Sequence, residues 1–591
     1  MYSTRLRLSL IASMRPYWSV QQKLQGQKII RTCCAGHGSD KVTTNSSTST
    51  KLKQDGPSLQ DFLKHSVEEL RPVEIGEQDT VPYLNENDVW GGRRKVYFET
   101  YGCQMNVSDT EIAWSVLKDS GYQRTESVND ADVILAVTCA IRENAEQKIW
   151  TRLQQFRAMK TRRGKNRPLK VGVLGCMAER LKKDLLEREK SVDLIAGPDA
   201  YRDLPRLLSL TSSGQRAANV VLSLEETYAD VMPVRMNAAA PTAFVSIMRG
   251  CDNMCSYCIV PFTRGRERSR PIRSILEEVW ALSGQGVKEV TLLGQNVNSY
   301  RDMSEQQHQL ADRPTNLSAG FGTIYRNKKG GLRFSALLDR VSQVDPEMRV
   351  RFVSPHPKDF PDEVLQLIRD RQNICSQLHL PAQSGSSQVL QRMRRNHTRE
   401  AYLELVQHVR EVIPDVSLSS DFIVGFCGET EEDHHQTLSL ARQVRYDNAY
   451  LFAYSMRKKT HAYHKLEDDV PAGVKQRRLA ELIDVCRQGM AEANAEKIGQ
   501  VHLVLVEGLS KKSPSDLAGR NDGNTKVIIP NMDIPEEVGG QKCAPMKAGD
   551  YVAVKITSST SQVLKGLPLA HTSLQGFPNM EWQGQRAVNS A

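Results

Sequence analysis

Short apolar runs alternate with helical periods between residues 95 and 230. The apolar runs have the length of buried parallel strands, and segments with the period of an amphipathic helix follow them. The runs are Lys95–Gly102, Val133–Thr138, Leu169–Gly175 and Leu194–Gly197, and the helical segments are Asp109–Ser120, Arg142–Met159 and Glu179–Glu189. Strand and helix in alternation predict an α/β domain with a parallel sheet over residues 95–230.

A second alternating series occupies residues 242–498. Its candidate strands are Ala243–Arg249, Glu289–Leu293, Val350–Val353, Ser376–Leu380, Ser417–Val424 and Ala449–Ala453, and helices such as Ser274–Ser283, Asp359–Asp370, Arg399–Ile413 and Thr430–Val444 lie between them. Six strand–helix units predict a partial (βα)6 barrel, because a closed barrel of this type needs eight. We expect the polar residues 302–330 to form an exposed loop, and residues 471–498 to form a helical linker.

The segments at the two ends of this region have other patterns. Alternation with a period of two in Val501–Glu507, Lys526–Ile529 and Tyr551–Thr557 predicts a small β-barrel over residues 499–567. We expect residues 568–591 to form an unstructured tail. Residues 40–94 are polar, and we expect them to form a linker.

Much of the formal net charge of +10 lies at the N-terminus. Residues 1–39 contain six Arg and Lys and no acidic residue, so the remainder has only a weak basic bias. A basic, acid-free leader predicts a mitochondrial presequence and a location in the matrix; the alternative is a disordered basic tail. The weak bias permits a nucleic-acid partner without requiring one. No apolar run is long enough to predict a membrane span.

Three of the twelve cysteines form the motif C-x3-C-x2-C directly after the first barrel strand. Cys251, Cys255 and Cys258 can bind three irons of a [4Fe–4S] cluster, which normally has four cysteine ligands. The fourth iron would then be free to chelate the amino and carboxylate groups of S-adenosylmethionine (SAM), so these cysteines are also the candidate catalytic centre. A zinc site is the alternative, but it needs four ligands and no second Cys/His pair lies close in sequence. The motif resembles that of the radical SAM superfamily.

A second group of cysteines marks the strand ends of the N-terminal domain. Cys103, Cys139 and Cys176 each follow a predicted parallel strand. Because such ends meet at one edge of an open sheet, where ligands bind, these residues predict a second cluster. Three unrelated buried cysteines are the alternative interpretation.

Polar and basic side chains complete the set of candidate site residues. Polar groups at successive barrel strand ends predict a SAM pocket, although each alone is typical of a cap or turn. These residues are Gln295, Asn296, Ser354, His356, His379, Gln383, Ser384 and Asp421. Arg264, Arg266 and Arg268 follow the cysteine loop and are predicted to bind substrate phosphates. Other basic stretches, such as residues 392–395, are interpreted as solvated faces.

Several longer motifs resemble those of the MiaB-type tRNA methylthiotransferases. They are Thr100-Tyr-Gly-Cys-Gln-Met-Asn106, Met248-Arg-Gly-Cys251, Cys258-Ile-Val-Pro-Phe-Thr-Arg-Gly265, Gly294-Gln-Asn-Val-Asn-Ser-Tyr300, His379-Leu-Pro-Ala-Gln-Ser-Gly385 and Ser420-Asp-Phe-Ile-Val-Gly425. The resemblance covers residues 95–567. It implies an N-terminal methylthiotransferase domain, a radical SAM barrel and a C-terminal TRAM domain that binds RNA.

The resemblance also implies a reaction, cofactors and partners. The reaction would convert N6-isopentenyladenosine, 3′ of the anticodon of mitochondrial tRNAs, to its 2-methylthio derivative. It would use SAM, two [4Fe–4S] clusters, a ferredoxin- or flavodoxin-like electron donor and a tRNA anticodon loop, and we expect a monomer. Within enzymes, the alternative substrate is threonylcarbamoyl-adenosine tRNA. From another class, the alternative is a regulatory binding protein of a cyclin-dependent kinase complex, with the kinase regulatory subunit as partner.

Overall fold

The computed structural model describes residues 84, 86–140, 143–164, 167–304, 317–323 and 330–579. The predicted presequence, most of the predicted linker and the second half of the predicted tail lie outside the described residues. None of the helices in the described ranges is long and apolar enough to cross a membrane.

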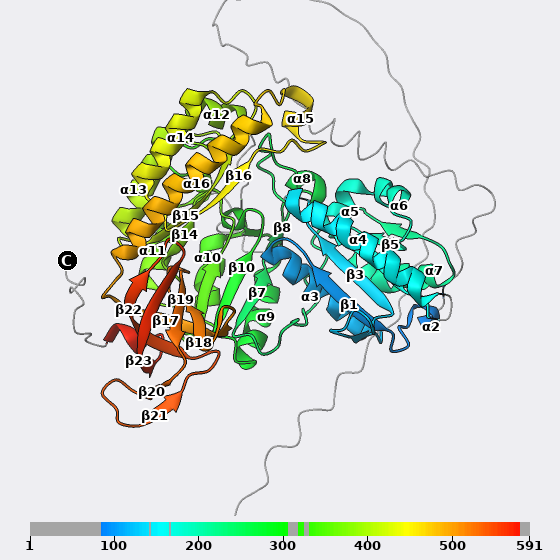
Figure 1. Ribbon diagram of the computed structural model, residues 1–591, viewed down its shortest axis with the longest axis horizontal. Coiled ribbons are helices and arrows are strands. Elements are labelled where there is room, and N and C mark those ends of the chain that lie inside the picture. The colour runs from blue at the N-terminus through cyan, green and yellow to red at the C-terminus, as the bar shows by residue number, and fades with distance from the viewer. Residues whose placement is uncertain are drawn as a thin grey trace, which may run out of the picture. The chain divides into compact units, whose positions relative to one another are not determined.

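The first domain contains a six-stranded parallel sheet (Figure 1). Its order is β2-β1-β3-β4-β5-β6, where the strands are β1 (Lys95–Thr100), β2 (Gln123–Arg124), β3 (Val133–Thr138), β4 (Lys170–Gly175), β5 (Leu194–Ala196) and β6 (Ala217–Asn219). The predicted parallel sheet is confirmed.

Helices cover both faces of this sheet. They are α3 (Gln104–Asp119) and α7 (Leu204–Ser212) on one face, and α4 (Glu143–Arg163), α5 (Cys176–Leu181) and α6 (Lys183–Arg188) on the other. Leu135 of β3 joins the core with α3 and α7, whereas its neighbour Ile134 joins the core with α4 and α5. Side chains that alternate between two buried faces explain why β3 is apolar at every position but its last. The helix predicted over 179–189 is interrupted, because Lys182 adopts a φ of 48°.

The second domain is a partial barrel of six parallel strands. They are β7 (Thr242–Ser246), β10 (Glu289–Leu293), β13 (Arg349–Phe352), β14 (Gln377–His379), β15 (Ser417–Val424) and β16 (Asn448–Ala453). Two three-stranded ladders, β7-β10-β13 and β14-β15-β16, are joined by a parallel bridge between Val350 and Ile374. The predicted (βα)6 arrangement is confirmed.

Helices alternate with the barrel strands along the chain, and a short hairpin follows β7. The helices are α9 (Ile272–Gly284), α10 (Phe334–Ser342), α11 (Asp362–Asp370), α12 (Ser387–Arg392), α13 (Arg399–Val412), α14 (Glu431–Val444), α15 (His461–Lys465) and α16 (Ala472–Ala495). The hairpin strands β8 (Met248–Arg249) and β9 (Arg268–Ser269) enclose α8 (Val260–Thr263) and the C-x3-C-x2-C loop.

The expectation of an exposed loop over residues 302–330 is only partly correct for the residues of this insert that the structure describes: Met303 is 66% exposed, whereas other residues of the insert are buried. The strands β11 (Arg301–Asp302) and β12 (Leu332–Arg333) pair at its base. Phe321 is buried and stacks on His397, with ring centroids 4.6 Å apart. Ser318 donates a backbone hydrogen bond to the Lys358 carbonyl. One apolar side chain in a polar stretch therefore attaches this segment to the barrel domain.

The C-terminal domain is a closed barrel in the order β17-β18-β19-β23-β22, as predicted. The strands are β17 (Val501–Ser510), β18 (Ser513–Arg520), β19 (Lys526–Pro530), β22 (Tyr551–Ser559) and β23 (Val563–Thr572), with a hairpin of β20 (Asp533–Pro535) and β21 (Cys543–Pro545). The predicted end at residue 567 is too early, because Thr572 of β23 pairs with Tyr551 at the far end of β22.

The predicted linker also extends too far. The helix α2 (Glu86–Val89) precedes β1, and Arg94 donates hydrogen bonds to the hydroxyls of Tyr122 and Ser212. Residues 86–94 therefore belong to the first domain.

Candidate functional site

Three adjacent strands of the first sheet each end at a cysteine. Cys103 caps the N-terminus of α3 after β1, Cys139 directly follows β3, and Cys176 begins α5 after β4. The strand order reverses between β1 and β3, and ligands of open α/β sheets bind at such a point. A Cβ on Gly102 would lie 2.7 Å from Cβ of Cys139, so only glycine permits this approach. The structure thus brings the second predicted group together.

Two thiols of this first-domain group, Cys139 and Cys176, are buried, Cys103 is partly exposed, and the three lie within electrostatic range of one another. Burial raises the pKa of Cys176 to about 11, and burial followed by the charge of Cys139 raises the pKa of Cys103. Such thiols keep their protons at neutral pH unless a positive group displaces them. Iron supplies that charge, because thiolates are the metal ligands and metal binding releases their protons.

The cysteines of the C-x3-C-x2-C motif, Cys251, Cys255 and Cys258, lie in the loop between β8 and α8. The amide of Cys258 donates to the Cys255 carbonyl at 3.0 Å, and the amide of Cys251 donates to the Gly265 carbonyl at 3.3 Å. Ser256 within the loop donates through its hydroxyl to the Arg392 carbonyl at 2.8 Å. Met254 adopts a φ of 47°, a strained conformation for this residue type that is typical of functional loops.

The Cys251 and Cys258 thiols also have raised pKa values. Burial, with the charge of Cys255 as the next cause, raises the pKa of Cys258 to about 12, and burial raises that of Cys251 well above its ordinary value. Among the described residues, no three His, Cys, Asp or Glu side chains are placed to hold a single metal ion. A [4Fe–4S] cluster has a different requirement, since each thiolate binds a separate iron. Both cysteine groups are compatible with that donor set.

Arg395 lies against the C-x3-C-x2-C loop. Its Nη1 donates to Sγ of Cys255 at 3.7 Å, and its Nη2 donates to the Pro381 carbonyl at 2.8 Å. Its Nε is buried and has no hydrogen-bond partner among the residues that the structure describes. The interpretation of residues 392–395 as a solvated face is therefore wrong for Arg395, whose burial the local sequence did not reveal.

Four of the eight predicted SAM-pocket residues make structural contacts. Gln295 accepts a hydrogen bond from the Gly250 amide at 2.6 Å. His356 Nδ1 accepts from the Lys358 amide at 3.2 Å, and burial lowers the His356 pKa well below its usual value. Ser384 bonds to the Thr437 hydroxyl at 3.3 Å. His379 bonds through Nδ1 to Ser419 at 3.0 Å. These four side chains support the loops at the strand ends.

The other four are placed differently. Asn296 is buried, and within the described ranges no donor forms a hydrogen bond with its Oδ1. Ser354 and Gln383 have φ angles of 59° and 69°, so the backbone is strained at two neighbouring strand ends. The Asp421 carboxylate, partly exposed, lies 3.4 Å from His379 Nε2. These residues retain polar groups that a ligand could use.

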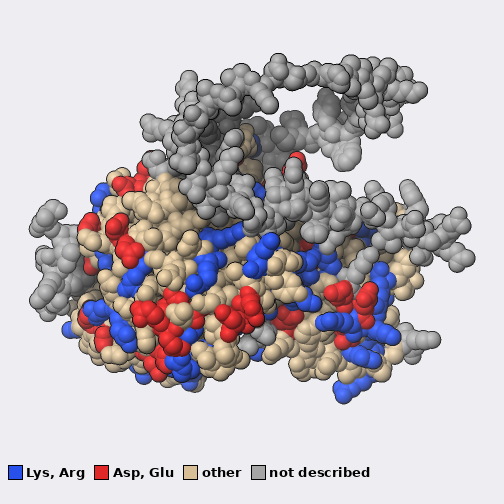
Figure 2. Space-filling model, turned by 90° about the horizontal axis from the view of Figure 1, so that it is seen from above, with Lys and Arg blue, Asp and Glu red and all other residues tan. Residues whose placement is uncertain are grey.

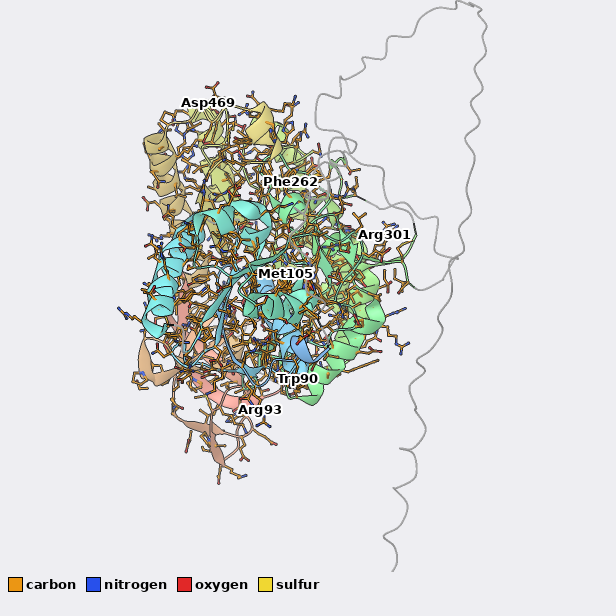
Figure 3. All side chains as sticks on the ribbon, turned by 90° about the vertical axis from the view of Figure 1, so that its right-hand side faces the viewer. Trp90, Arg93, Met105, Phe262, Arg301 and Asp469 are labelled. Carbon is orange, nitrogen blue, oxygen red and sulfur yellow. The ribbon has the colours of Figure 1, made fainter. Side chains whose placement is uncertain are left out.

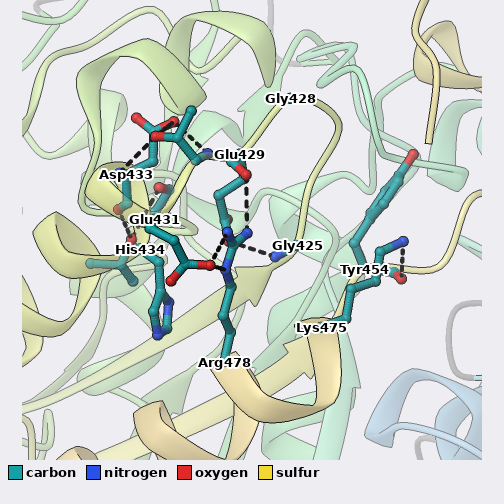
Figure 4. Close-up of polar contacts among 12 residues, drawn as sticks. Gly425, Gly428, Glu429, Glu431, Asp433, His434, Tyr454, Lys475 and Arg478 are labelled. Carbon is teal, nitrogen blue, oxygen red and sulfur yellow. Dashed lines mark hydrogen bonds and ion pairs between the residues drawn. The ribbon is translucent and has the colours of Figure 1, made fainter. Parts of the chain in front are cut away.

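A buried ion pair holds the loop that follows β15 (Figure 4). The Glu429 carboxylate accepts hydrogen bonds from the Gly425 amide at 2.8 Å and from Arg478 of α16 at 3.0 Å. Thr430 and Asp433 form a capping box at the start of α14. The loop is thereby fixed to α14 and α16.

The structure places the predicted phosphate-binding arginines in another environment. The side chains of Arg264 and Arg268 are 3% and 4% exposed, and each is paired with a buried aspartate, Asp109 and Asp199 respectively. Neither guanidinium is presented to a phosphate, which corrects that expectation for these two residues. Arg266 is 28% exposed and pairs with Asp252, so its role stays a prediction. On the face shown in Figure 2, basic and acidic side chains are interspersed.

Sequence reasoning also missed a polar network between the first two domains. Asp109 of α3 pairs with Arg249 of β8 at 2.8 Å and with Arg264, after α8, at 2.6 Å. Met105 of α3 and Phe262 of α8, both labelled in Figure 3, mark the two segments that this network joins. The positions of Asn106 and Asp109, one helical turn apart after Cys103, were the available signal.

Three family models match the chain. They are the Uncharacterized protein family UPF0004 over residues 95–197, the Radical SAM superfamily over residues 245–441 and the TRAM domain over residues 495–569.

Similar proteins extend over most of the chain. A human protein named Mitochondrial tRNA methylthiotransferase CDK5RAP1 is 63% identical over 535 residues, which cover 88% of this chain and 89% of that protein. A protein of Chloroherpeton thalassium named tRNA-2-methylthio-N(6)-dimethylallyladenosine synthase is 52% identical over 474 residues, which cover 80% and 96%. Among solved structures, the radical SAM methyltransferase TsrM of Kitasatospora setae aligns with a TM-score of 0.43 at 14% identity, over 61% of this chain and 72% of that one.

Proposed function

The chain belongs to the family of MiaB-type tRNA methylthiotransferases, and on that premise we propose that it methylthiolates mitochondrial tRNA. The substrate would be N6-isopentenyladenosine (N6-dimethylallyladenosine) immediately 3′ of the anticodon, and the product its 2-methylthio derivative. The observation that carries this proposal is the presence of two complete groups of three cysteines, one in each of two domains. A regulatory binding protein would need neither group.

The residues divide the work between two sites. Cys251, Cys255 and Cys258 would hold one [4Fe–4S] cluster, and Cys103, Cys139 and Cys176 the other. When bound, the clusters and SAM supply electron transfer, radical formation and sulfur transfer. The protein itself fixes the six thiols in the loops that follow the strands, burying Cys139, Cys176 and Cys251 and leaving Cys103, Cys255 and Cys258 partly exposed. No general base is required of it, because C2 of adenine carries no acidic proton.

The polar residues of the barrel refine the proposed SAM pocket. Asn296, Ser354, Gln383 and Asp421 would contact SAM, because their polar atoms or strained backbones lie at successive strand ends. Gln295, His356, His379 and Ser384 would position those loops through the contacts described above.

The choice of substrate follows from family and chemistry. Proteins reach single bases most readily in loops, where unstacked bases can be splayed out. Burial of the isopentenyl group could contribute roughly 2–3 kcal/mol at about 0.8 kcal/mol per CH2, which is around a hundredfold preference over bare adenosine.

The substrate assay supplies reconstituted enzyme, SAM and reductant with isopentenylated, threonylcarbamoylated or bare tRNA. We expect methylthio product mainly from the isopentenylated tRNA, detected by mass spectrometry of nucleosides. Equal turnover on all three, or a preference for the threonylcarbamoylated tRNA, would overturn the assignment.

Substitutions in the two cysteine groups should abolish different steps of the reaction. Cys255→Ala should abolish reductive SAM cleavage, whereas Cys139→Ala should retain cleavage and yield no methylthio product. Cys486→Ala, a buried cysteine of α16 outside both groups, is the matched control and should retain both activities. Methylthiolation by Cys139→Ala at the unaltered rate would show that the second cluster is not needed.

The proposal includes a location and partners. We place the protein in the mitochondrial matrix, in line with the name of its human relative, and deletion of residues 1–39 should then abolish import while leaving purified activity intact. Import that persists after this deletion would contradict the assignment of the presequence.

A ferredoxin- or flavodoxin-like donor would supply electrons. A monomer suffices, because each cysteine group is complete within one chain.

A further inference from the structure

Arg264 connects the two cysteine-bearing segments. It directly follows α8, which packs against α5, the helix that begins with Cys176. Its side chain is 3% exposed, and its Nε donates to Sγ of Cys176 at 3.1 Å. An arginine six residues after Cys258 therefore contacts a cysteine of the other domain.

The same guanidinium is fixed by the helix that begins after Cys103. Its Nη2 donates to Oδ1 of Asn106 at 3.0 Å and to Oδ2 of Asp109 at 2.6 Å, and both residues belong to α3. Arg249 also pairs with Asp109, so the carboxylate lies between two cations from the barrel domain. Contacts with Cys176 on one side and with α3 on the other fix the orientation of the guanidinium.

One donor of Arg264 has no acceptor among the described residues. This atom, Nη1, is buried, and no hydrogen-bond partner lies within reach of it in that part of the chain. A buried charged donor left unpaired is costly, so such an atom in a folded protein requires an explanation. A sulfur atom held at the three thiols would satisfy it, since Nε of the same guanidinium already contacts one of them.

We propose that Arg264 is a positioning residue for the iron–sulfur site of Cys103, Cys139 and Cys176. It holds the Cys176 sulfur and places a fixed positive charge beside the cluster. Because reduction adds negative charge, this cation stabilises the reduced form and raises the reduction potential; hydrogen bonds to the sulfurs and burial tune such potentials. The inference rests on the proposed function, since it requires a cluster at these cysteines.

The test uses the full chain with Cys251, Cys255 and Cys258 replaced by Ala, so that only the first-domain cluster remains. Iron content and the midpoint potential, followed by electron paramagnetic resonance, are compared for this parent and for Arg264→Met and Arg264→Lys. We expect Arg264→Met to lower the equilibrium constant for reduction at least tenfold, which is about 59 mV for one electron. Arg264→Lys, which keeps the positive charge, should shift the midpoint potential less than Arg264→Met does.

Arg270→Met is the matched control. Arg270 is also a buried arginine paired with a buried carboxylate, Glu278, but it contacts neither cysteine group. Its removal should leave the potential unchanged. If Arg264→Met loses iron while Arg270→Met keeps it, and both remain folded by circular dichroism, the positioning role is supported. If Arg264→Met unfolds, Arg264→Gln, which removes the charge but keeps a polar side chain, is measured in its place: a lowered midpoint potential supports the role of Arg264, and an unchanged one overturns it.

Three results would count against the inference. An iron-free parent would overturn the proposed function itself. A parent with iron and an unchanged potential in both Arg264 variants would overturn only the role of Arg264. A weaker tRNA affinity of Arg264→Met with a smaller salt dependence, at unchanged potential, would return Arg264 to the role of a phosphate contact.

Discussion

Asp109 is a fully buried carboxylate between two arginines of the neighbouring domain. Burial alone would raise the pKa of Asp109, but the charges of Arg264 and Arg249 outweigh it and hold the pKa below the ordinary value of 3.8. Because folding lowers the pKa of Asp109, its ion pairs stabilise the folded protein at pH values above the ordinary pKa of the carboxyl group. This stabilisation is lost as the pH falls through the folded-state pKa.

Asp109→Asn should therefore destabilise the apo protein strongly at neutral pH. Removing one partner leaves two buried cations without a counter-charge, a change that costs about 3–5 kcal/mol in such sites. In denaturant unfolding, the difference in free energy of unfolding between the unaltered protein and the variant should decrease below about pH 4, where the carboxyl group of the unfolded chain begins to take up a proton.

Asp119→Asn, at the exposed end of the same helix, is the control for Asp109→Asn and should change the free energy of unfolding by less than about 0.5 kcal/mol. If Asp109→Asn lowers the free energy of unfolding by the same amount at every pH, that result would contradict the lowered pKa of Asp109.

Among the elements, the β8–β9 hairpin determines where the C-x3-C-x2-C loop lies. Gly250 precedes Cys251 and has a φ of 77°, a conformation that glycine adopts readily and other residues rarely. A Cβ at this position would lie 2.1 Å from the Arg266 carbonyl oxygen. Backbone atoms cannot move aside as a side chain could, so the close pairing of the two loop ends depends on this glycine.

Gly250→Ala should consequently displace the loop. We expect loss of iron from the Cys251 group and loss of SAM cleavage, while iron bound by the Cys103 group is retained. Gly489→Ala is the matched control, because Gly489 lies inside α16 and a Cβ there meets no atom within 4 Å. That variant should gain about 0.5–1 kcal/mol of stability from helix propensity. Full iron content in Gly250→Ala would contradict the steric argument.

At the scale of the whole molecule, two arginines of β13 bind the C-terminal barrel through its backbone. Arg349 donates to the carbonyls of Arg520 at 3.0 Å and Leu503 at 2.8 Å, and Arg351 donates to that of Asn521 at 2.8 Å. Tyr551 of β22 lies against the Arg349 guanidinium, with its ring centroid 5.2 Å away. These contacts hold β17 and β18 against the radical SAM domain.

Arg349→Ala should loosen that attachment. Each carbonyl left without its donor costs about 1–3 kcal/mol, so amide hydrogen exchange in β17 and β18 should accelerate while iron content is unchanged. Lys555→Ala, at an exposed position of β22, should leave exchange as it was. Equal exchange in both variants would mean that other contacts carry the attachment.

The sequence by itself determined the order of the domains and the places of the cysteines. The bounds predicted for β3, β10 and β15 agree with the structure. A short apolar run between polar segments is buried as a strand in a layered fold, so the ends of the run mark the ends of the strand. Cysteines directly after such runs reach one edge of a parallel sheet whatever the details of packing. The family resemblance, drawn from local motifs, is confirmed over most of the chain.

Only the tertiary structure decided the roles of the charged side chains. Arg264 and Arg395 stand in basic stretches that are typical of a surface, yet both are buried beside cysteines. The partner of Arg264, Cys176, is 88 residues away in the chain. Phe321 packs against His397 in the same long-range manner. Periodicity reports which face of an element is apolar, but it carries no information about which distant element covers that face, and burial and pairing depend on that.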